Sequence, residues 1–103
     1  MDSQETLEIE YRLKRKEYEE KEEDLYRQRD KAISVIEEVQ ERSHYYLNKT
    51  SQDNEIHKQG FKQTEHLKDD IFDVTSENLK ELSRKIEDLE EEYYHNLRKL
   101  NRK

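Results

Sequence analysis

Apolar side chains recur at seven-residue intervals through the first half of this 103-residue chain. The members of this row are Tyr11, Tyr18, Leu25, Ala32, Val39 and Tyr46. The second half continues in steps of three and four, with one longer step after Val74, through Leu67, Ile71, Val74, Leu79, Leu82, Ile86, Leu89, Tyr93, Leu97 and Leu100. Such steps place apolar residues along one face of an α-helix, as in coiled coils. Because the chain has no proline, which would end a helix, the sequence predicts an all-α protein.

The periodicity fails in the segment Asn-Lys-Thr-Ser-Gln-Asp-Asn-Glu at 48–55, whose side chains favour turns. We therefore expect a single helical hairpin over 1–103, with helices at about 4–48 and 56–101 and a turn at about 49–55. Ser51 or Asp53 would cap the second helix. The alternative is one continuous helix that carries this polar segment through its middle.

Charged residues make up 46% of the chain, with a net charge of −7, and they form blocks of alternating sign. In an antiparallel hairpin whose facing residue numbers sum to about 104, these blocks are complementary. The basic block Arg12–Lys16 then faces the acidic block Glu87–Glu92, and the acidic block Glu17–Asp24 faces the basic block Lys80–Lys85. Exposed ion pairs contribute little energy each, so these blocks specify the register and orientation more than the stability.

The same register predicts a seam between the helices, with Tyr11 opposite Tyr93. The expected seam residues are Tyr11, Tyr18, Leu25, Leu79, Leu82, Ile86, Leu89 and Tyr93. Between them in the first helix we place Lys14, Lys21 and Gln28, which would make the seam narrow.

Several apolar residues beyond this seam predict a second surface that faces a helical protein partner. The expected partner interface is Ile33, Val35, Ile36, Val39, Tyr45, Tyr46, Leu47 and Phe72. Leu, Ile, Val and Phe are only about a fifth of the residues, and a small chain of this kind buries too little surface to be stable alone. The partner would be a larger helical protein or a second copy of the chain.

The sequence offers little for catalysis or for metal binding. No cysteine is present, which excludes disulfides and thiolate sites. The histidines lack a paired-ligand spacing and are expected to be solvated: His44, His57, His66 and His95. Glu65, Asp69 and Asp73 recur every four residues, which favours a salt-bridged helix face over a cation site. We expect no catalytic residue, no cofactor, no metal and no enzymatic activity.

Composition also restricts the partners and the location that we expect. The negative net charge, with acidic blocks opposite the basic clusters, argues against nucleic acid. No apolar stretch approaches the roughly 20 residues that span a bilayer, which predicts no membrane insertion. The first residues show no signal-peptide pattern, so we expect a cytoplasmic protein.

The charged second helix carries the resemblance to a known family. Its segment is Leu-Ser-Arg-Lys-Ile-Glu-Asp-Leu-Glu-Glu-Glu-Tyr-Tyr-His-Asn-Leu-Arg-Lys-Leu at 82–100. In a hairpin of about a hundred residues without Cys or Pro, this segment resembles the WXG-like small helical partner proteins of LXG toxins in Gram-positive type VII secretion. The resemblance implies an adaptor that binds the helical amino-terminal region of a toxin in a pre-secretion complex. A second small helical protein can join that complex, and export of the adaptor with its partner is left open.

The chain departs from that family at two motifs. It has no Trp-x-Gly turn, and its one glycine, Gly60, is followed by Phe61. An aromatic residue with an acid four positions later is the family's export motif near the carboxy terminus, and here the matches lie elsewhere, at Tyr18–Glu22, Tyr26–Asp30 and Phe61–Glu65. The chain therefore resembles an accessory partner that lacks the export signal. The alternative function is a self-associating coiled-coil scaffold or spacer.

Overall fold

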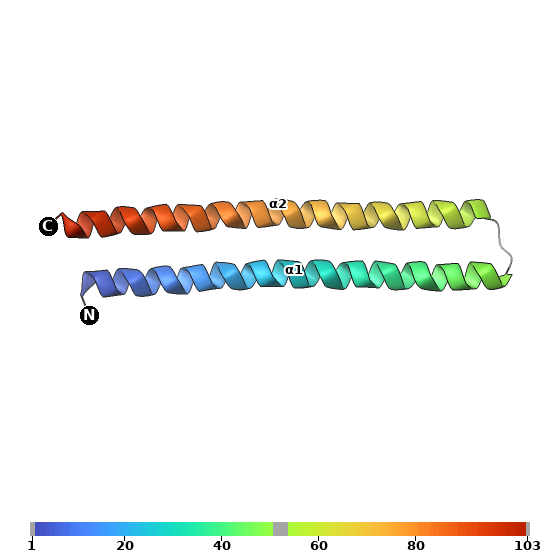
Figure 1. Cartoon of the computed structure of the whole chain (residues 1–103), viewed down its shortest axis with the longest axis horizontal. Coiled ribbons are helices and arrows are strands. Elements are labelled where there is room, and N and C mark those ends of the chain that lie inside the picture. The colour runs from blue at the N-terminus through green and yellow to red at the C-terminus, as the bar shows by residue number, and fades with distance from the viewer. Residues whose placement is uncertain (1, 51–53, 103) are drawn as a thin grey trace. The chain divides into compact units, whose positions relative to one another are not determined.

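Two long helices make up the protein in the computed structural model, which describes residues 2–50 and 54–102. Helix α1 spans Ser3–Thr50 and helix α2 spans Asn54–Asn101, with 48 residues each (Figure 1). No strand occurs in either of the two described segments. The predicted all-α helical hairpin is confirmed. The two cap candidates, Ser51 and Asp53, lie outside the described residues.

Polar side chains explain where α1 begins and how α2 ends. The backbone N–H of Glu5 donates to Oδ1 of Asp2 at 2.7 Å, so Asp2 satisfies an amide that the first turn leaves unpaired. Arg98 and Lys99 lie in the last turn of α2, where positive charge is favoured by the helix dipole. Asp2 therefore favours the start of α1, and Arg98 and Lys99 favour the end of α2.

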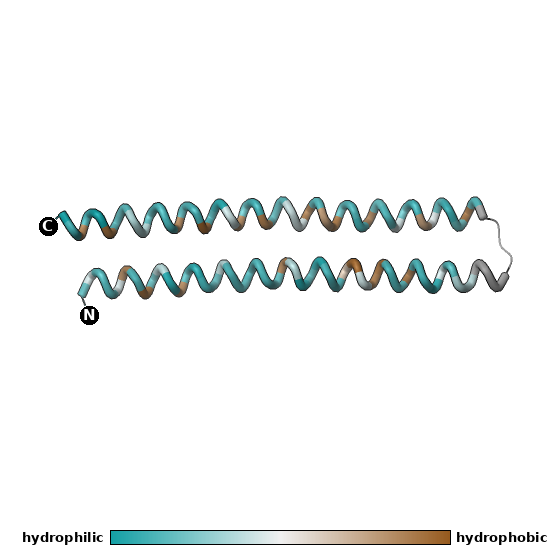
Figure 2. Tube along the Cα trace, in the orientation of Figure 1, coloured by the Kyte–Doolittle hydropathy of each residue, from teal (hydrophilic) through white to brown (hydrophobic). Residues whose placement is uncertain are grey.

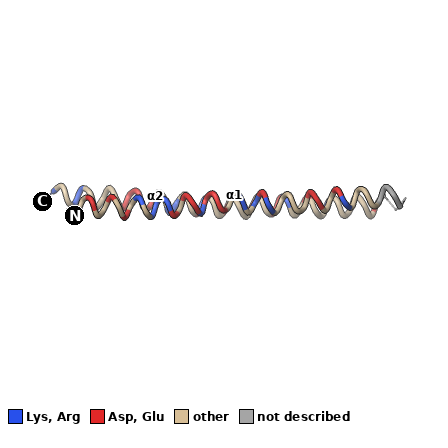
Figure 3. Tube along the Cα trace, turned by 90° about the horizontal axis from the view of Figure 1, so that it is seen from below, with Lys and Arg blue, Asp and Glu red and all other residues tan. Residues whose placement is uncertain are grey.

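The packing divides the chain into two compact units, which we call the terminal unit and the central unit. The terminal unit comprises Met1–Leu25 and Glu77–Lys103, and the central unit comprises Tyr26–Ser76. Each contains one segment of α1 and one of α2, and the two segments run antiparallel (Figure 1). Charges of both signs are interspersed along both helices (Figure 3).

The seam of the terminal unit is largely apolar. Leu82 is its buried residue, at 7% exposure, and the other seven predicted seam residues are half-buried. The predicted pairing of Tyr11 with Tyr93 is observed as stacked rings, with centroids 4.4 Å apart and planes at 19°. Hydrophobic positions recur along this part of α2 between hydrophilic ones (Figure 2).

The intermediate positions on α1 differ from those expected. Arg15 and Glu22 are half-buried, whereas Lys14 and Lys21 are exposed. Arg15 forms an ion pair with Glu90, one of the cross-helix contacts that the charge blocks predicted. The seam of α1 thus advances from Tyr11 in steps of four and then three, whereas the expected positions follow steps of three and then four.

The seam of the central unit is largely polar, and the apolar stripe predicted there is wrong in detail. Thr75 is buried, at 8% exposure, while its neighbour Val74 is 57% exposed. Leu67 is likewise 52% exposed, and the adjacent Lys68 has a side chain only 18% exposed. Each step of four, from Ile71 to Thr75 and from Thr75 to Leu79, turns the side-chain direction by only about 40°, whereas the step of five after Val74 would turn it by about 140°.

On α1 the predicted seven-residue row likewise leaves the seam in the central unit. Val39 and Tyr46 are 52% and 63% exposed. Around Val39 the half-buried residues are Ile36 and Gln40 instead. A strict period of seven drifts around a helix of 3.6 residues per turn, so the row that begins in the seam ends beside it.

Candidate partner-binding surface

Exposed apolar side chains are concentrated in the central unit. Among the residues whose burial the structure describes, three large exposed apolar residues lie in the terminal unit and ten in the central unit. Those of the central unit are Tyr26, Val35, Val39, Tyr45, Tyr46, Ile56, Phe61, Leu67, Phe72 and Val74. In a coiled coil that is stable alone, the seam is apolar and the exterior is polar, whereas the central unit has the opposite arrangement. Exposed apolar surface of this kind marks an interaction site.

Five of these ten residues lie on the same side of the central unit. Each directly precedes a recessed seam residue: Val35 before Ile36, Val39 before Gln40, Ile56 before His57, Leu67 before Lys68 and Val74 before Thr75. Two antiparallel helices are related by a local twofold axis perpendicular to their common plane, so positions that precede the seam on either helix face the same way. We call these five residues the apolar flank, and their exposure ranges from 52% to 61%.

Charged side chains cover the opposite side of the central unit, which supports the assignment of the five apolar residues to one side. Nζ of Lys68 lies 3.9 Å from Oε1 of Glu37 and 3.3 Å from Oε1 of Glu65, and both acids directly follow a seam residue. The guanidinium carbon of Arg29 lies 5.7 Å from the ring centroid of Phe72, another residue that follows the seam. We call Glu37, Glu65 and Phe72, together with the cations Lys68 and Arg29 that reach them from the seam, the charged flank.

Glu65 is held in its ionised form by neighbouring donors. Nε2 of Gln40 donates to Oε1 of Glu65 at 3.0 Å and to Oγ1 of Thr64 at 2.8 Å. The hydrogen bond from Gln40, followed by that from Lys68, lowers the pKa of Glu65 below its usual value of 4.5. The two hydrogen bonds from Gln40 cross between α1 and α2 and fix the register of a seam that has few apolar contacts.

The one glycine of the chain gives the apolar flank a place of close approach. Gly60 lies four residues after Ile56 and seven before Leu67, so it shares their helix face. No atom lies within 4 Å of the position that a Cβ would occupy at Gly60. The backbone of α2 is therefore open at this point, and another helix can approach it closely.

The predicted interface residues are distributed over several faces. Val35 and Val39 belong to the apolar flank. Tyr46, seven residues after Val39, shares its helix face, and the ring of Tyr45 lies edge-on to that of Tyr46 at 5.7 Å. Phe72 lies on the charged flank beside Arg29 instead.

Of three further predicted interface residues, two are less exposed than expected and one has a side chain that the structure does not describe. Ile33 and Ile36 are half-buried. Leu47 lies outside the residues whose side chains the structure describes. The sequence prediction did not include Ile56, Leu67 and Val74 among the exposed apolar residues of the second surface, and the structure places all three there.

The terminal unit holds a polar cluster around Arg15. Its guanidinium donates to the hydroxyl oxygen of Tyr11 at 2.7 Å and to Oε1 of Glu19 at 3.2 Å, and it pairs with Glu90. These hydrogen bonds raise the pKa of Arg15 above its usual value. Desolvation, reinforced by the charge of Glu8, raises the pKa of Tyr93. An arginine held by three partners orders the seam but supplies no nucleophile or general base.

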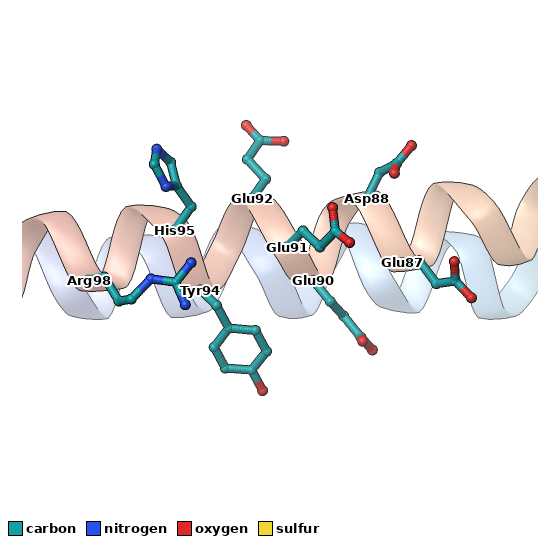
Figure 4. A pocket seen from close by; sticks show the side chains of 8 residues that line it. All are labelled: Glu87, Asp88, Glu90, Glu91, Glu92, Tyr94, His95 and Arg98. Carbon is teal, nitrogen blue, oxygen red and sulfur yellow. The ribbon is translucent and has the colours of Figure 1, made fainter.

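A surface hollow on α2 is open and strongly acidic. Its lining side chains all come from this one helix and point in several directions (Figure 4): Glu87, Asp88, Glu90, Glu91, Glu92, Tyr94, His95 and Arg98. A hollow with a single helix as its wall cannot enclose a substrate or exclude water. This surface therefore does not form an enclosed catalytic site.

Two of the four histidines meet across the helices. Nδ1 of His44 lies 3.3 Å from Nε2 of His57, and the two ring centroids are 5.2 Å apart. Their sequence spacing gave no sign of this contact, which arises because His44 lies near the end of α1 and His57 near the start of α2. His66 and His95 are exposed.

Comparison of the chain with family models, with curated proteins and with solved structures gave no match. Within the described part of the chain, neither helix has an apolar segment long enough to cross a bilayer. Across the same part, no group of three or more His, Asp or Glu side chains is arranged to hold a metal ion.

Proposed function

We propose that this chain is a non-enzymatic helical adaptor that binds the helical amino-terminal region of an LXG-type toxin. The observation that carries the proposal is the apolar flank on the central unit. Its five side chains, each more than half exposed, present on the order of 400–500 Å² of surface, which is within the range of about 300–600 Å² for the largest patches on ordinary monomers. A stable interface buries about 800 Å² on each partner, so this flank would form the centre of one.

The chemistry of the flank indicates what kind of partner it fits. Its residues are aliphatic and lie on two parallel lines, along α1 and along α2, with open backbone at Gly60 between Ile56 and Leu67. An amphipathic helix laid along this surface would fill it with its own apolar stripe. Lys31 on α1 also precedes a half-buried position, Ala32, and it favours an acidic residue beside that stripe.

The experiment compares two double variants of the full chain. Val39→Ser with Leu67→Ser removes two apolar groups from the flank, and Ile9→Ser with Leu13→Ser removes two exposed groups from the terminal unit. We expect the flank variant to bind a purified LXG amino-terminal segment at least tenfold more weakly, because burying the exposed halves of Val39 and Leu67 contributes about 1.5–3 kcal/mol together. The terminal-unit variant should bind like the unaltered chain.

Circular dichroism establishes that each variant remains helical, and light scattering gives the mass of the chain with and without the segment. Equal binding by both variants would place the interface elsewhere. A stable oligomer of the chain alone that ignores every LXG segment would refute the adaptor function and favour the alternative, a self-associating scaffold.

A further inference from the structure

The histidine pair at the turn end of the central unit carries an inference independent of the apolar flank. We propose that His44 and His57 form a two-ligand site for a tetrahedral divalent metal ion, Zn²⁺. The two side chains come from α1 and α2, so a bound ion would join the two helices directly. Neither residue takes part in the proposed partner interface.

The separation of the two nitrogens fits a tetrahedral ion. Two nitrogens that each lie about 2.05 Å from a tetrahedral Zn²⁺ are about 3.3–3.4 Å apart, whereas neighbouring ligands at right angles would be about 2.9 Å apart. The observed distance between Nδ1 of His44 and Nε2 of His57 is 3.3 Å. The pair thus has the spacing of tetrahedral rather than octahedral or square-planar ligands.

The distance between the two imidazole rings also fits a tetrahedral ion. If each imidazole centre lies beyond its ligating nitrogen on the line to the metal, the two ring centres are about 5.2 Å apart at the tetrahedral angle. The observed centroid distance is 5.2 Å. A straight hydrogen bond between the same nitrogens would hold the centres farther apart, at about 5.6 Å. Both distances are those expected if the two nitrogens bind a common tetrahedral ion.

Hydrogen bonding between the two rings leaves an unpaired polar atom whichever tautomer forms. Nδ1 of His57 is buried and has no hydrogen-bond partner. If His44 donates, Nδ1 of His57 is a buried N–H without an acceptor, and if His57 donates, Nδ1 is a buried lone pair. Zinc ligation by Nε2 fixes His57 in the first of these tautomers, with the proton on Nδ1.

The unpartnered Nδ1 of His57 also limits the affinity of the site for zinc. Zinc-ligating histidines usually donate their second N–H to an acceptor that orients them, and Nδ1 of His57 lacks one. No third His, Asp or Glu completes a cluster within the described segments, so water would complete the coordination. We therefore expect weaker binding than at a structural zinc site with four protein ligands.

Bound zinc would strengthen the part of the hairpin whose seam is most polar. An ion that binds only the folded chain stabilises it in proportion to the logarithm of its concentration above the dissociation constant. Because the bridge joins α1 to α2 across the turn, zinc should raise the melting temperature of the chain.

The test uses the full chain without an affinity tag and titrates it with Zn²⁺ alone by calorimetry. The variants are His44→Ala and His57→Ala, and the matched controls are His66→Ala and His95→Ala, which remove exposed histidines elsewhere. We expect one ion per chain, an affinity at least tenfold lower in each pair variant, and unchanged affinity in both controls. Circular dichroism without metal checks that the four variants are equally helical.

Two further readouts test the geometry. Co²⁺, which prefers the same ligands, should give the intense visible absorption of a tetrahedral site, and this absorption should be absent from both pair variants. Zinc should raise the melting temperature of the unaltered chain and of the controls only. Equal loss of affinity in all four variants, or an octahedral Co²⁺ spectrum in the unaltered chain, would overturn the proposal.

Discussion

Exchanging two neighbouring residues tests the seam of the central unit without changing the composition of the chain. In the double variant Val74→Thr with Thr75→Val, the hydroxyl moves from a position that is 8% exposed to one that is 57% exposed. Both residues are β-branched and have similar helix propensities, so the intrinsic stability of α2 is unaffected. What changes is which side chain is removed from water.

The expected gain follows from these exposures. Placing a methyl instead of a hydroxyl at residue 75, which is only 8% exposed, contributes about 0.8 kcal/mol. Replacing a methyl by a hydroxyl at residue 74, where less than half of the methyl is buried, costs about 0.3–0.4 kcal/mol. The net gain in the free energy of unfolding is therefore about 0.5 kcal/mol, which raises the melting temperature of a domain of this size by about 2–4 °C.

Thermal and urea unfolding followed by far-ultraviolet circular dichroism measure this difference directly. The two single variants serve as controls: Thr75→Val alone should give the whole gain, and Val74→Thr alone should give a small loss. A less stable double variant would mean that Val74 occupies the seam, as the apolar stripe alone suggests, and would refute the flank assignment. If the flank binds a helical partner, the stabilised double variant should also bind that partner more weakly, because Val74 is lost from the flank.

Three further predictions concern other parts of the hairpin. Gly60→Ala should stabilise the chain by about 0.5–1 kcal/mol in urea unfolding, because a methyl at that position meets no atom within 4 Å and glycine disfavours a helix interior; a loss would show that the site is not open. Leu25→Asp together with Leu79→Asp should abolish the helical circular dichroism, because two like charges would enter the apolar seam of the terminal unit; unchanged melting would disprove the register. Because the pKa of Glu65 is lowered in the folded state, its stabilising contribution is present above the unfolded value of about 4.5 and is lost as the pH falls through the folded value. Melting temperatures between pH 7 and about 3 should therefore fall less steeply in Glu65→Gln than in the unaltered chain, and parallel profiles would contradict the role of Gln40.

Much of the fold could be predicted from the sequence because it depends on patterns that repeat. The absence of proline, the apolar steps and the complementary charge blocks indicate two antiparallel helices, and the stacking of Tyr11 on Tyr93 agrees with the predicted register. The cap of α1 at Asp2 was not predicted, because one acidic residue among several at the amino terminus is not distinctive.

The seam of the central unit could not be read from hydrophobicity. An apolar stripe follows Leu67 and Val74, whereas the packed positions follow Lys68 and Thr75, one residue later. Lysine can lie at such a seam because its methylene stem packs while its ammonium reaches carboxylates at the edge. Where polar residues fill a seam, the buried positions are not the most hydrophobic ones. Only the three-dimensional register then shows which positions are packed.

The contrast between the two seams also implies a gradient in native-state amide hydrogen exchange. Helix segments with few apolar contacts open locally at a lower free energy than segments around a buried leucine and stacked tyrosines. Backbone amides near Thr64 and Gln40 should thus exchange through small openings, while those near Leu82 should exchange only when the whole chain unfolds. A helix bound along the apolar flank would slow exchange in the central unit first, so the less stable half of the hairpin is also the half that a partner can most strongly order.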